Sequence, residues 1–159
     1  MVAMAGKSEE LDGLAAIAAA ELKVPISLIT FVDDEGQTFK GEHGLPATLA
    51  MIRRMPISYS ICQFTIREPQ PLVIPDTEVH PMVMGHPSVV EMGIRAYLGI
   101  PLVLANGHTI GSLSFVDYVP RKWPASEISQ AEALAVKAVG FLEAALSRHR
   151  ETAGQPLEN

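Results

Sequence analysis

The apolar residues between positions 8 and 22 recur at intervals of three and four, which places them along one side of a helix. Glu9 and Glu10 open this segment, and acidic side chains in a first turn interact favourably with the helix dipole. We therefore predict an amphipathic helix over residues 8–22. Its apolar stripe consists of Leu11, Leu14, Ala15, Ala18 and Leu22.

From Pro25 onward the pattern becomes that of β-strands. A run of apolar and β-branched residues covers 26–32, a polar turn follows at 33–36, and a second extended segment covers 37–42. This order predicts a hairpin with a polar tip.

A second hairpin is predicted from two longer extended segments, 96–105 and 109–117. The Asn-Gly pair at 106–107 joins them, and this dipeptide accepts the positive φ angles of a tight turn. Alternate residues of the later segment point to opposite faces, and neither face is strongly polar. We therefore expect this segment to be a central strand that is covered on both sides.

The middle and the end of the chain differ in their periodicity. Residues 44–93 are rich in Pro and Met without a long periodic segment, which predicts short helices and loops around one strand at 72–74. After Ser126, a helix cap, apolar residues return at helical spacing, and the basic run 148–150 suits the negative end of a helix. The apolar stripe of this predicted helix consists of Ile128, Ala131, Leu134, Ala135, Ala138, Leu142 and Ala145.

The order of these elements predicts an α+β fold with a central antiparallel sheet of about five to six strands. The terminal helices would pack together on one face, and the irregular helical insert would cover the other. Such a layout leaves a cavity between the sheet and the insert. We expect one domain over residues 8–150, with flexible ends at 1–7 and 151–159.

Composition limits the kinds of partner that the protein can bind and the cellular compartment in which it is expected. The formal net charge is −6 and no long basic cluster is present, which argues against a nucleic-acid-binding protein. No apolar stretch reaches the roughly 20 residues that a membrane span needs, and the N-terminal region does not resemble a signal peptide, so we expect a cytoplasmic protein. The single cysteine, Cys62, excludes an internal disulfide and a Cys-rich zinc site.

Several motifs resemble those of one known family. The segment Ile94–Leu102, with Ile110–Leu113 and the Pro120-Arg121 pair after it, resembles the second half of bacterial GAF domains. Ser60–Cys62 and Pro71–Asp76 resemble the central segment of the same family. The resemblance extends over about residues 8–148 and implies a GAF/PAS-like fold with a sensory or regulatory role. Members of this family bind cyclic nucleotides, tetrapyrroles, small metabolites or anions, and others act as ligand-free dimerisation modules.

Three branches of the family fit this sequence poorly. The free methionine-(R)-sulfoxide reductases need a nucleophilic and a resolving cysteine, and only Cys62 is present. Bilin-binding members attach the pigment through a cysteine in the insert shortly before the Ala96–Leu98 region. The matching stretch here has His80-Pro81 and His86-Pro87 but no cysteine, so no covalent bilin is expected. The Asn-Lys…Phe…Asp signature of cyclic-nucleotide binders is absent as well. We therefore predict a protein that is not an enzyme.

The insert carries a run of histidines and methionines, His80–His86. Imidazole and thioether groups can hold a soft metal, and His86 can serve as an axial haem ligand, so a non-covalent haem or metal sensor is one alternative. In the other interpretation, Met82 and Met84 pack beneath the loop and the histidines lie at its edge.

The cavity between the sheet and residues 76–93 is the predicted ligand site. Arg95 offers charge to an anion, although a salt bridge with Glu91 is an equal alternative, and Tyr97 shares its face two residues on. Asp76 begins the loop that would roof the cavity, where it either contacts a ligand or caps a turn. The other candidate ligand-binding residues are Phe39, Met82, Val83, His86, Val89 and Phe115.

Two functions from different classes follow from this sequence. In the first, a sensory domain binds a small apolar or weakly anionic molecule and signals through a homodimer of the terminal helices. The dimer is suggested by a second apolar line on the last helix, Val136, Val139 and Leu146. In the second, the domain is an interaction module with a filled core and no ligand. We also expect Asp117 and Arg121 to pair and stabilise the turn at Pro120.

Overall fold

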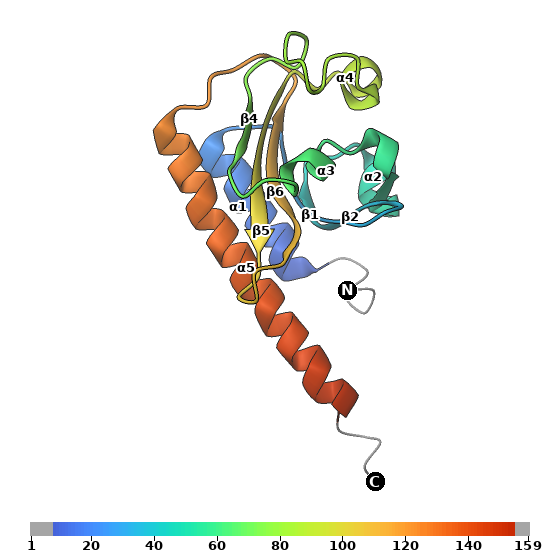
Figure 1. Ribbon diagram of the computed structural model, residues 1–159, viewed down its shortest axis with the longest axis vertical. Coiled ribbons are helices and arrows are strands. Elements are labelled where there is room, and N and C mark those ends of the chain that lie inside the picture. The colour runs from blue at the N-terminus through green and yellow to red at the C-terminus, as the bar shows by residue number, and fades with distance from the viewer. Residues whose placement is uncertain (1–7, 155–159) are drawn as a thin grey trace.

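The computed structural model of the protein describes residues 8–154 and contains one six-stranded antiparallel sheet in the order β3-β2-β1-β6-β5-β4 (Figure 1). The predicted α+β class is therefore confirmed, with the central strands β1 and β6 paired along their length. The strands are β1 (Ile26–Val32), β2 (Gly36–His43), β3 (Arg54–Pro56), β4 (Leu72–Ile74), β5 (Ala96–Val103) and β6 (Thr109–Asp117).

Both predicted hairpins are present. In the turn between β1 and β2, the Asp33 carboxylate accepts the backbone N–H groups of Glu35 and Gly36 at 2.9 and 3.0 Å. In the turn between β5 and β6, Gly107 has a φ of 91°, which a glycine adopts without strain. Local turn chemistry thus sets the pairing of these strands.

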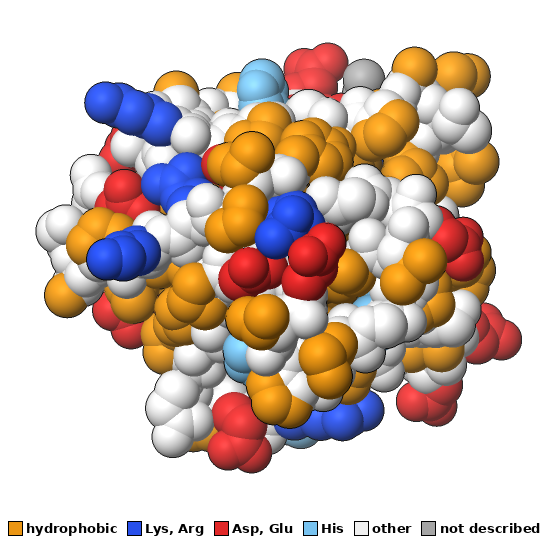
Figure 2. Space-filling view, turned by 90° about the horizontal axis from the view of Figure 1, so that it is seen from above, with side chains coloured by type: hydrophobic (Ala, Val, Ile, Leu, Met, Phe, Trp, Pro, Cys, Tyr) orange, Lys and Arg blue, Asp and Glu red, His pale blue; other side chains and the backbone are white. Residues whose placement is uncertain are grey.

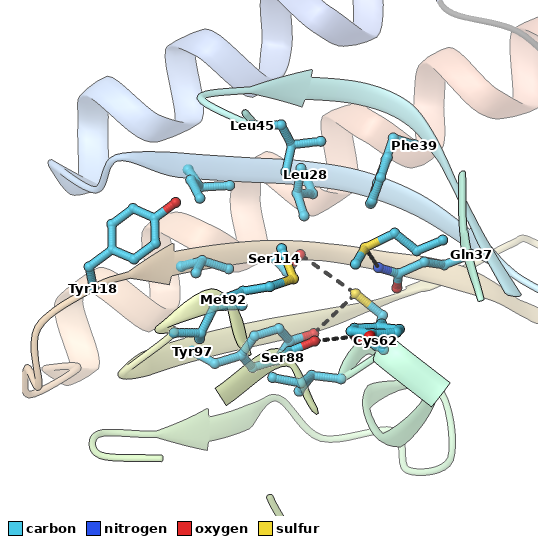
Figure 3. A pocket seen from close by; sticks show the side chains of 16 residues that line it. Leu28, Gln37, Phe39, Leu45, Cys62, Ser88, Met92, Tyr97, Ser114 and Tyr118 are labelled. Carbon is cyan, nitrogen blue, oxygen red and sulfur yellow. Dashed lines mark hydrogen bonds between the residues drawn. The ribbon is translucent and has the colours of Figure 1, made fainter. Parts of the chain in front are cut away.

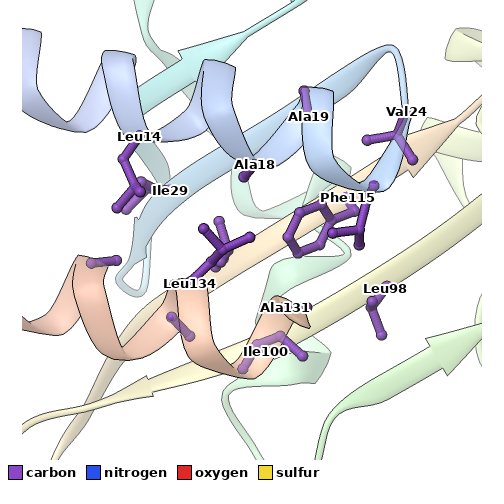
Figure 4. Packing of buried hydrophobic residues seen from close by; sticks show 14 of the residues in the cluster. Leu14, Ala18, Ala19, Val24, Ile29, Leu98, Ile100, Phe115, Ala131 and Leu134 are labelled. Carbon is purple, nitrogen blue, oxygen red and sulfur yellow. The ribbon is translucent and has the colours of Figure 1, made fainter. Parts of the chain in front are cut away.

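The two terminal helices, α1 (Glu9–Leu22) and α5 (Ala125–Gly154), pack on one face of the sheet (Figure 1). Ser8 caps α1 by accepting the N–H of Leu11 at 3.2 Å. Figure 4 shows the predicted stripes of both helices meeting the sheet, with Leu134 and Ala131 facing Phe115 and Leu98. The predicted packing of the terminal helices is confirmed.

The insert lies on the opposite face and forms a second core (Figure 1). Its helices are α2 (Ala47–Ile52), the 3₁₀ turn η2 (Ile57–Tyr59), α3 (Cys62–Thr65) and α4 (Pro87–Met92). Side chains from β1 and β2, including Leu28 and Phe39, point into this second core. The sheet is therefore covered on both faces, as the sequence predicts.

Three details differ from the prediction. The insert contributes a second strand, β3, in addition to the expected β4. Helix α5 begins at Ala125, which places Ser126 inside its first turn instead of at the cap. The helix also continues to Gly154, because no proline interrupts the segment Ala125–Gly154. Residues 151–154 are thus helical, and the remainder of the expected flexible ends, 1–7 and 155–159, lies outside the described residues.

Arg121 joins three elements at one end of the sheet. Its guanidinium donates to the carbonyl oxygens of Leu22 and Lys23, at the end of α1, over 3.1 and 3.2 Å. It also pairs with Asp117 at the end of β6 at 3.4 Å and with Glu127 in the first turn of α5 at 3.0 Å. The predicted Asp117–Arg121 pair is therefore confirmed, and it belongs to a larger junction that includes both terminal helices.

None of the helices between residues 8 and 154 has both the length and the apolar character that crossing a membrane requires.

Candidate functional site

An inner cavity lies between the sheet and the insert (Figure 3). Its volume is about 40 Å³, which is room for roughly two or three water molecules. The walls are mostly aliphatic and aromatic, and none of the described residues that line it carries a formal charge. The cavity therefore suits a small neutral group. The apolar lining residues are Ile26, Leu28, Phe39, Leu45, Met55, Ile61, Met92, Ile94 and Val116.

An outer groove adjoins this cavity and opens to solvent between α2 and α4. Its volume is about 720 Å³, within the range that holds a drug-sized molecule. Met55, Tyr59, Met92 and Tyr118 line both spaces, so these side chains form the partition between them. Movement of the partition would join the two spaces into one site. Pro46, Leu49, Ile52, Arg54, Pro56 and Glu91 complete the lining of the groove.

Tyr59 is fixed across the mouth of the site. Its hydroxyl donates to a carboxylate oxygen of Glu91 on α4 at 2.6 Å, and its backbone carbonyl accepts the hydroxyl of Ser88. The hydrogen bond to Glu91 and the negative charge of that residue raise the pKa of Tyr59 above its usual value. Two contacts thus hold η2 and α4 together where the groove meets the cavity.

Tyr97 supplies the first polar group on the cavity wall. The tyrosine is 2% exposed, and its hydroxyl lies 2.9 Å from Thr65 Oγ1 and 3.4 Å from Cys62 Sγ (Figure 3). Ser114 Oγ lies 3.7 Å from the same sulfur. Burial, with the neighbouring Cys62 thiol, raises the pKa of Tyr97 well above its usual value. The phenol therefore stays neutral at physiological pH.

Gln37 supplies the second polar group, and it is 4% exposed. The Ser60 hydroxyl accepts the N–H of Gln63 at 3.0 Å and donates to Gln37 Oε1 at 2.7 Å. This bond turns Gln37 Nε2 toward Met55 Sδ, 3.5 Å away on the paired strand β3. A thioether is a weak acceptor, so the amide N–H groups of Gln37 have little hydrogen bonding of their own.

The structure places only some of the predicted site residues at the cavity. Phe39 and Tyr97 line the inner cavity. Val83 and Val89 belong to the same core of the insert but do not line the cavity. Phe115 was predicted on the wrong face, because it packs beneath α1 and α5 on the other side of the sheet.

Arg95 and Asp76 lie away from both the cavity and the groove. Arg95 pairs with Asp76 at 3.1 Å and with Glu78 at 3.4 Å, so the alternative partner Glu91 is wrong. The backbone N–H of Glu78 and the Arg95 guanidinium lower the pKa of the Asp76 carboxyl. The pair lies at the end of the sheet, between the end of β4 and the start of β5, and both side chains are 28% exposed.

The His80–His86 segment also lies outside the cavity lining. Met82 and Met84 are 49% and 62% exposed, so the expectation that they pack beneath the loop is wrong. Figure 2 shows the end of the molecule that carries this loop, with hydrophobic side chains gathered over much of it. Among the side chains that the structure describes, those of residues 8–148, no group of three His, Cys, Asp or Glu is arranged to hold a metal ion.

His86 acts as the cap of α4. Its Nδ1 accepts the N–H of Ser88 at 3.1 Å, and its ring meets Phe64 edge to face at 5.9 Å. Burial lowers the pKa of His86, while a backbone hydrogen bond with Ser60 raises it by less. The neutral imidazole that a cap requires is therefore favoured.

Several residues of the site were not among the sequence candidates. The sequence contains a signal for Gln37, because this residue precedes Phe39 by two positions on one strand and so shares its face. Met55 and Tyr59 had none, since they belong to a segment without periodicity. The cavity is accordingly roofed by residues 45–62 and 88–94 instead of the whole of 76–93.

Comparisons with known proteins agree with this architecture. The profile of the GAF domain family matches residues 8–139, and the chain belongs to this family. A cyclic di-GMP phosphodiesterase of Pseudomonas aeruginosa is 32% identical over 117 residues, which are 73% of this chain and 19% of that protein. The chain thus spans about a fifth of the length of this relative.

Two solved structures show the same fold. The GAF domain of a phosphoenolpyruvate-protein phosphotransferase from Coxiella burnetii has a TM-score of 0.73 at 17% identity, with 88% of this chain and 84% of that chain covered. The corresponding domain from Acinetobacter has a TM-score of 0.71 at 15% identity, with the same coverage. These likenesses concern the fold alone.

Proposed function

We propose that this GAF domain is a sensory module that binds a small, neutral, largely apolar molecule in the inner cavity and the outer groove. The observation that carries the proposal is that only a partition of side chains, two of them methionines, separates the two spaces. Methionine adapts its shape readily, so Met55 and Met92 can withdraw without a rearrangement of the sheet. The relationship to a cyclic di-GMP phosphodiesterase supports a role in signalling.

The charges around the site favour a neutral ligand over the weakly anionic alternative. Arg95 is engaged by Asp76 and Glu78 outside the cavity lining. Arg54, in the groove, already pairs with Asp33 at 3.1 Å. An anion would therefore have to compete with a carboxylate for either guanidinium.

The site also supports a binding role over catalysis. Attack of a thiol on a sulfoxide leads to a disulfide and so requires a second thiol, whereas Cys62 is the one cysteine of the sequence. Its sulfur is buried and in contact with the Tyr97 and Ser114 hydroxyls. We therefore assign Cys62 to the cavity wall.

The proposal predicts that freshly purified protein retains a small molecule, visible as a mass difference between native and denaturing mass spectrometry. Leu49→Trp should weaken retention, because the indole would project into the groove and compete with the ligand for it. Thr48→Trp introduces the same side chain at an exposed position of the same helix and should retain the molecule. No retained mass in the parent protein, with no thermal shift across a metabolite panel, would favour the closed interaction module.

We further propose a homodimer through the terminal helices. Val136 is 72% exposed on α5, and the part of α5 beyond Leu142, the last buried side chain described on it, projects past the sheet (Figure 1). An isolated helical segment of this length is only marginally stable in water, so a partner helix would stabilise it. Val139, from the predicted apolar line, is partly used by the core, whereas Val136 remains available.

Multi-angle light scattering at micromolar concentration tests the dimer. We expect twice the chain mass for the parent protein and a shift of the dissociation constant by at least about tenfold for Val136→Glu, since a charge would be buried at the contact. Val90→Glu is the matched control, because Val90 is 71% exposed on α4. A parent protein that is monomeric at these concentrations would refute the dimer.

A further inference from the structure

Gln37 is a buried side chain of the inner cavity whose hydrogen-bonding capacity is only partly used. Its Oε1 is occupied by the Ser60 hydroxyl at 2.7 Å, whereas its Nε2 has only the Met55 thioether at 3.5 Å. The amide is 4% exposed, so bulk water does not compensate for the weak acceptor. A stronger acceptor that reached this buried, weakly bonded donor would therefore stabilise it.

The orientation of this amide is set by its neighbours. Ser60 Oγ receives the N–H of Gln63 at 3.0 Å, which leaves the hydroxyl hydrogen available for Gln37 Oε1. The side-chain amide of Gln63 is itself engaged by the carbonyl oxygens of Ile57 and Ser60, each at 2.7 Å. The local network therefore presents the nitrogen of Gln37 toward Met55 and the cavity.

Met55 occupies the position that an acceptor atom would take. It lies opposite Gln37 in the register of β2 and β3, and β3 is an edge strand of three residues. Met55 lines both the inner cavity and the outer groove. Withdrawal of its unbranched side chain would open the cavity to the groove and free the Gln37 amide in a single movement.

We infer that Gln37 determines the specificity of the site for molecules that carry a neutral acceptor oxygen, such as a ketone, ester or lactone, on an apolar body. The oxygen replaces the Met55 thioether as the acceptor for Gln37 Nε2, and the apolar body lies where the cavity meets the groove. This inference rests on the proposed function, because it requires the cavity to admit a ligand.

A pair of probes of the same shape isolates the acceptor. Acetophenone carries a carbonyl oxygen, and α-methylstyrene carries a methylene group in its place. Titrations followed by two-dimensional ¹H–¹⁵N NMR give the dissociation constant of each probe and the shift of the Gln37 side-chain amide. We expect the parent protein to prefer acetophenone by about five- to tenfold, the effect of one buried hydrogen bond. The amide protons should move downfield with acetophenone alone.

Two substitutions test whether Gln37 is the donor and whether the Met55 thioether is the acceptor that the ligand replaces. Gln37→Leu should bring the two affinities within about twofold, whereas the matched control Gln130→Leu, at an exposed position of α5, should keep the preference. Met55→Leu preserves an apolar side chain but removes the sulfur, so the preference for acetophenone should increase. If Gln37→Leu does not fold, the parent amide shift and Met55→Leu decide the question.

The outcomes separate the two proposals. Equal affinities in the parent protein, or a preference that survives Gln37→Leu, would overturn the role of Gln37 and leave the ligand-binding cavity intact. If neither probe binds at millimolar concentration, the inference fails together with the proposed cavity. A preference that disappears only in Gln37→Leu supports both.

Discussion

Gly111→Ala is expected to destabilise the domain by more than about 4 kcal/mol, which is a large part of the stability of an ordinary domain. A Cβ atom at this position would lie 1.7 Å from the carbonyl oxygen and 2.8 Å from the carbonyl carbon of Thr30. Both atoms belong to the backbone of β1, so no side-chain rotation can relieve the overlap. Because β1 and β6 are the central strands, their separation would disrupt both cores.

Urea unfolding followed by circular dichroism measures this effect. Gly140→Ala is the matched control, since nothing lies within 4 Å of the added methyl group in the exposed middle of α5. It should stabilise the protein by about 0.5–1 kcal/mol, because alanine favours the helix. A Gly111→Ala protein that unfolds within about 1 kcal/mol of the parent would contradict the close approach of the two strands.

Arg121→Met should have the second largest effect, a loss of about 2 kcal/mol of unfolding free energy. The substitution leaves Asp117 and Glu127 without their shared cation and removes the donors from the last carbonyls of α1. The loss is smaller than for a fully buried pair, because the arginine side chain is 18% exposed. The stacking of its guanidinium on Trp123, at 4.5 Å, is lost as well.

Thermal unfolding combined with hydrogen exchange tests this prediction. Exchange should accelerate at the end of α1 and in the first turn of α5, where Arg121 is bound. Arg54→Met is the control, because its pair with Asp33 is 40% and 62% exposed and should contribute less than about 1 kcal/mol. Arg121→Lys should restore little, since an ammonium group cannot reach four acceptors with the fixed fork of a guanidinium. Rescue by lysine would mean that charge alone holds the junction.

The long elements of the fold were predictable because each follows one period. The stripe of α1 repeats at three and four residues, and the β5–β6 hairpin has an Asn-Gly pair at its turn. Strand β3 was not predictable, since three residues are too few to show alternation. Its existence depends on the partner strand β2, which only the tertiary structure supplies.

The site was predicted less completely for a related reason. Alternation placed Leu113 and Phe115 on one face of β6 and Ser114 and Val116 on the other, but it did not say which face meets the terminal helices. The structure turns the bulkier apolar pair toward the helices and Ser114 with Val116 toward the cavity. Arg95 precedes the first residue of β5, and carboxylates distant in sequence engage it.

The length of α5 gives the junction at Arg121 a mechanical meaning. The helix has 30 residues and so measures about 45 Å, and it is fastened in its first turn to the strand whose neighbouring residues Val116 and Tyr118 line the cavity. A change of about 5° in the direction of such a rod displaces its far end by about 4 Å. The helix is therefore a lever that pivots at its first turn, beside the Arg121 junction. A small displacement of β6 at that junction would reach the far end of the helix as a displacement comparable to the spacing of neighbouring residues.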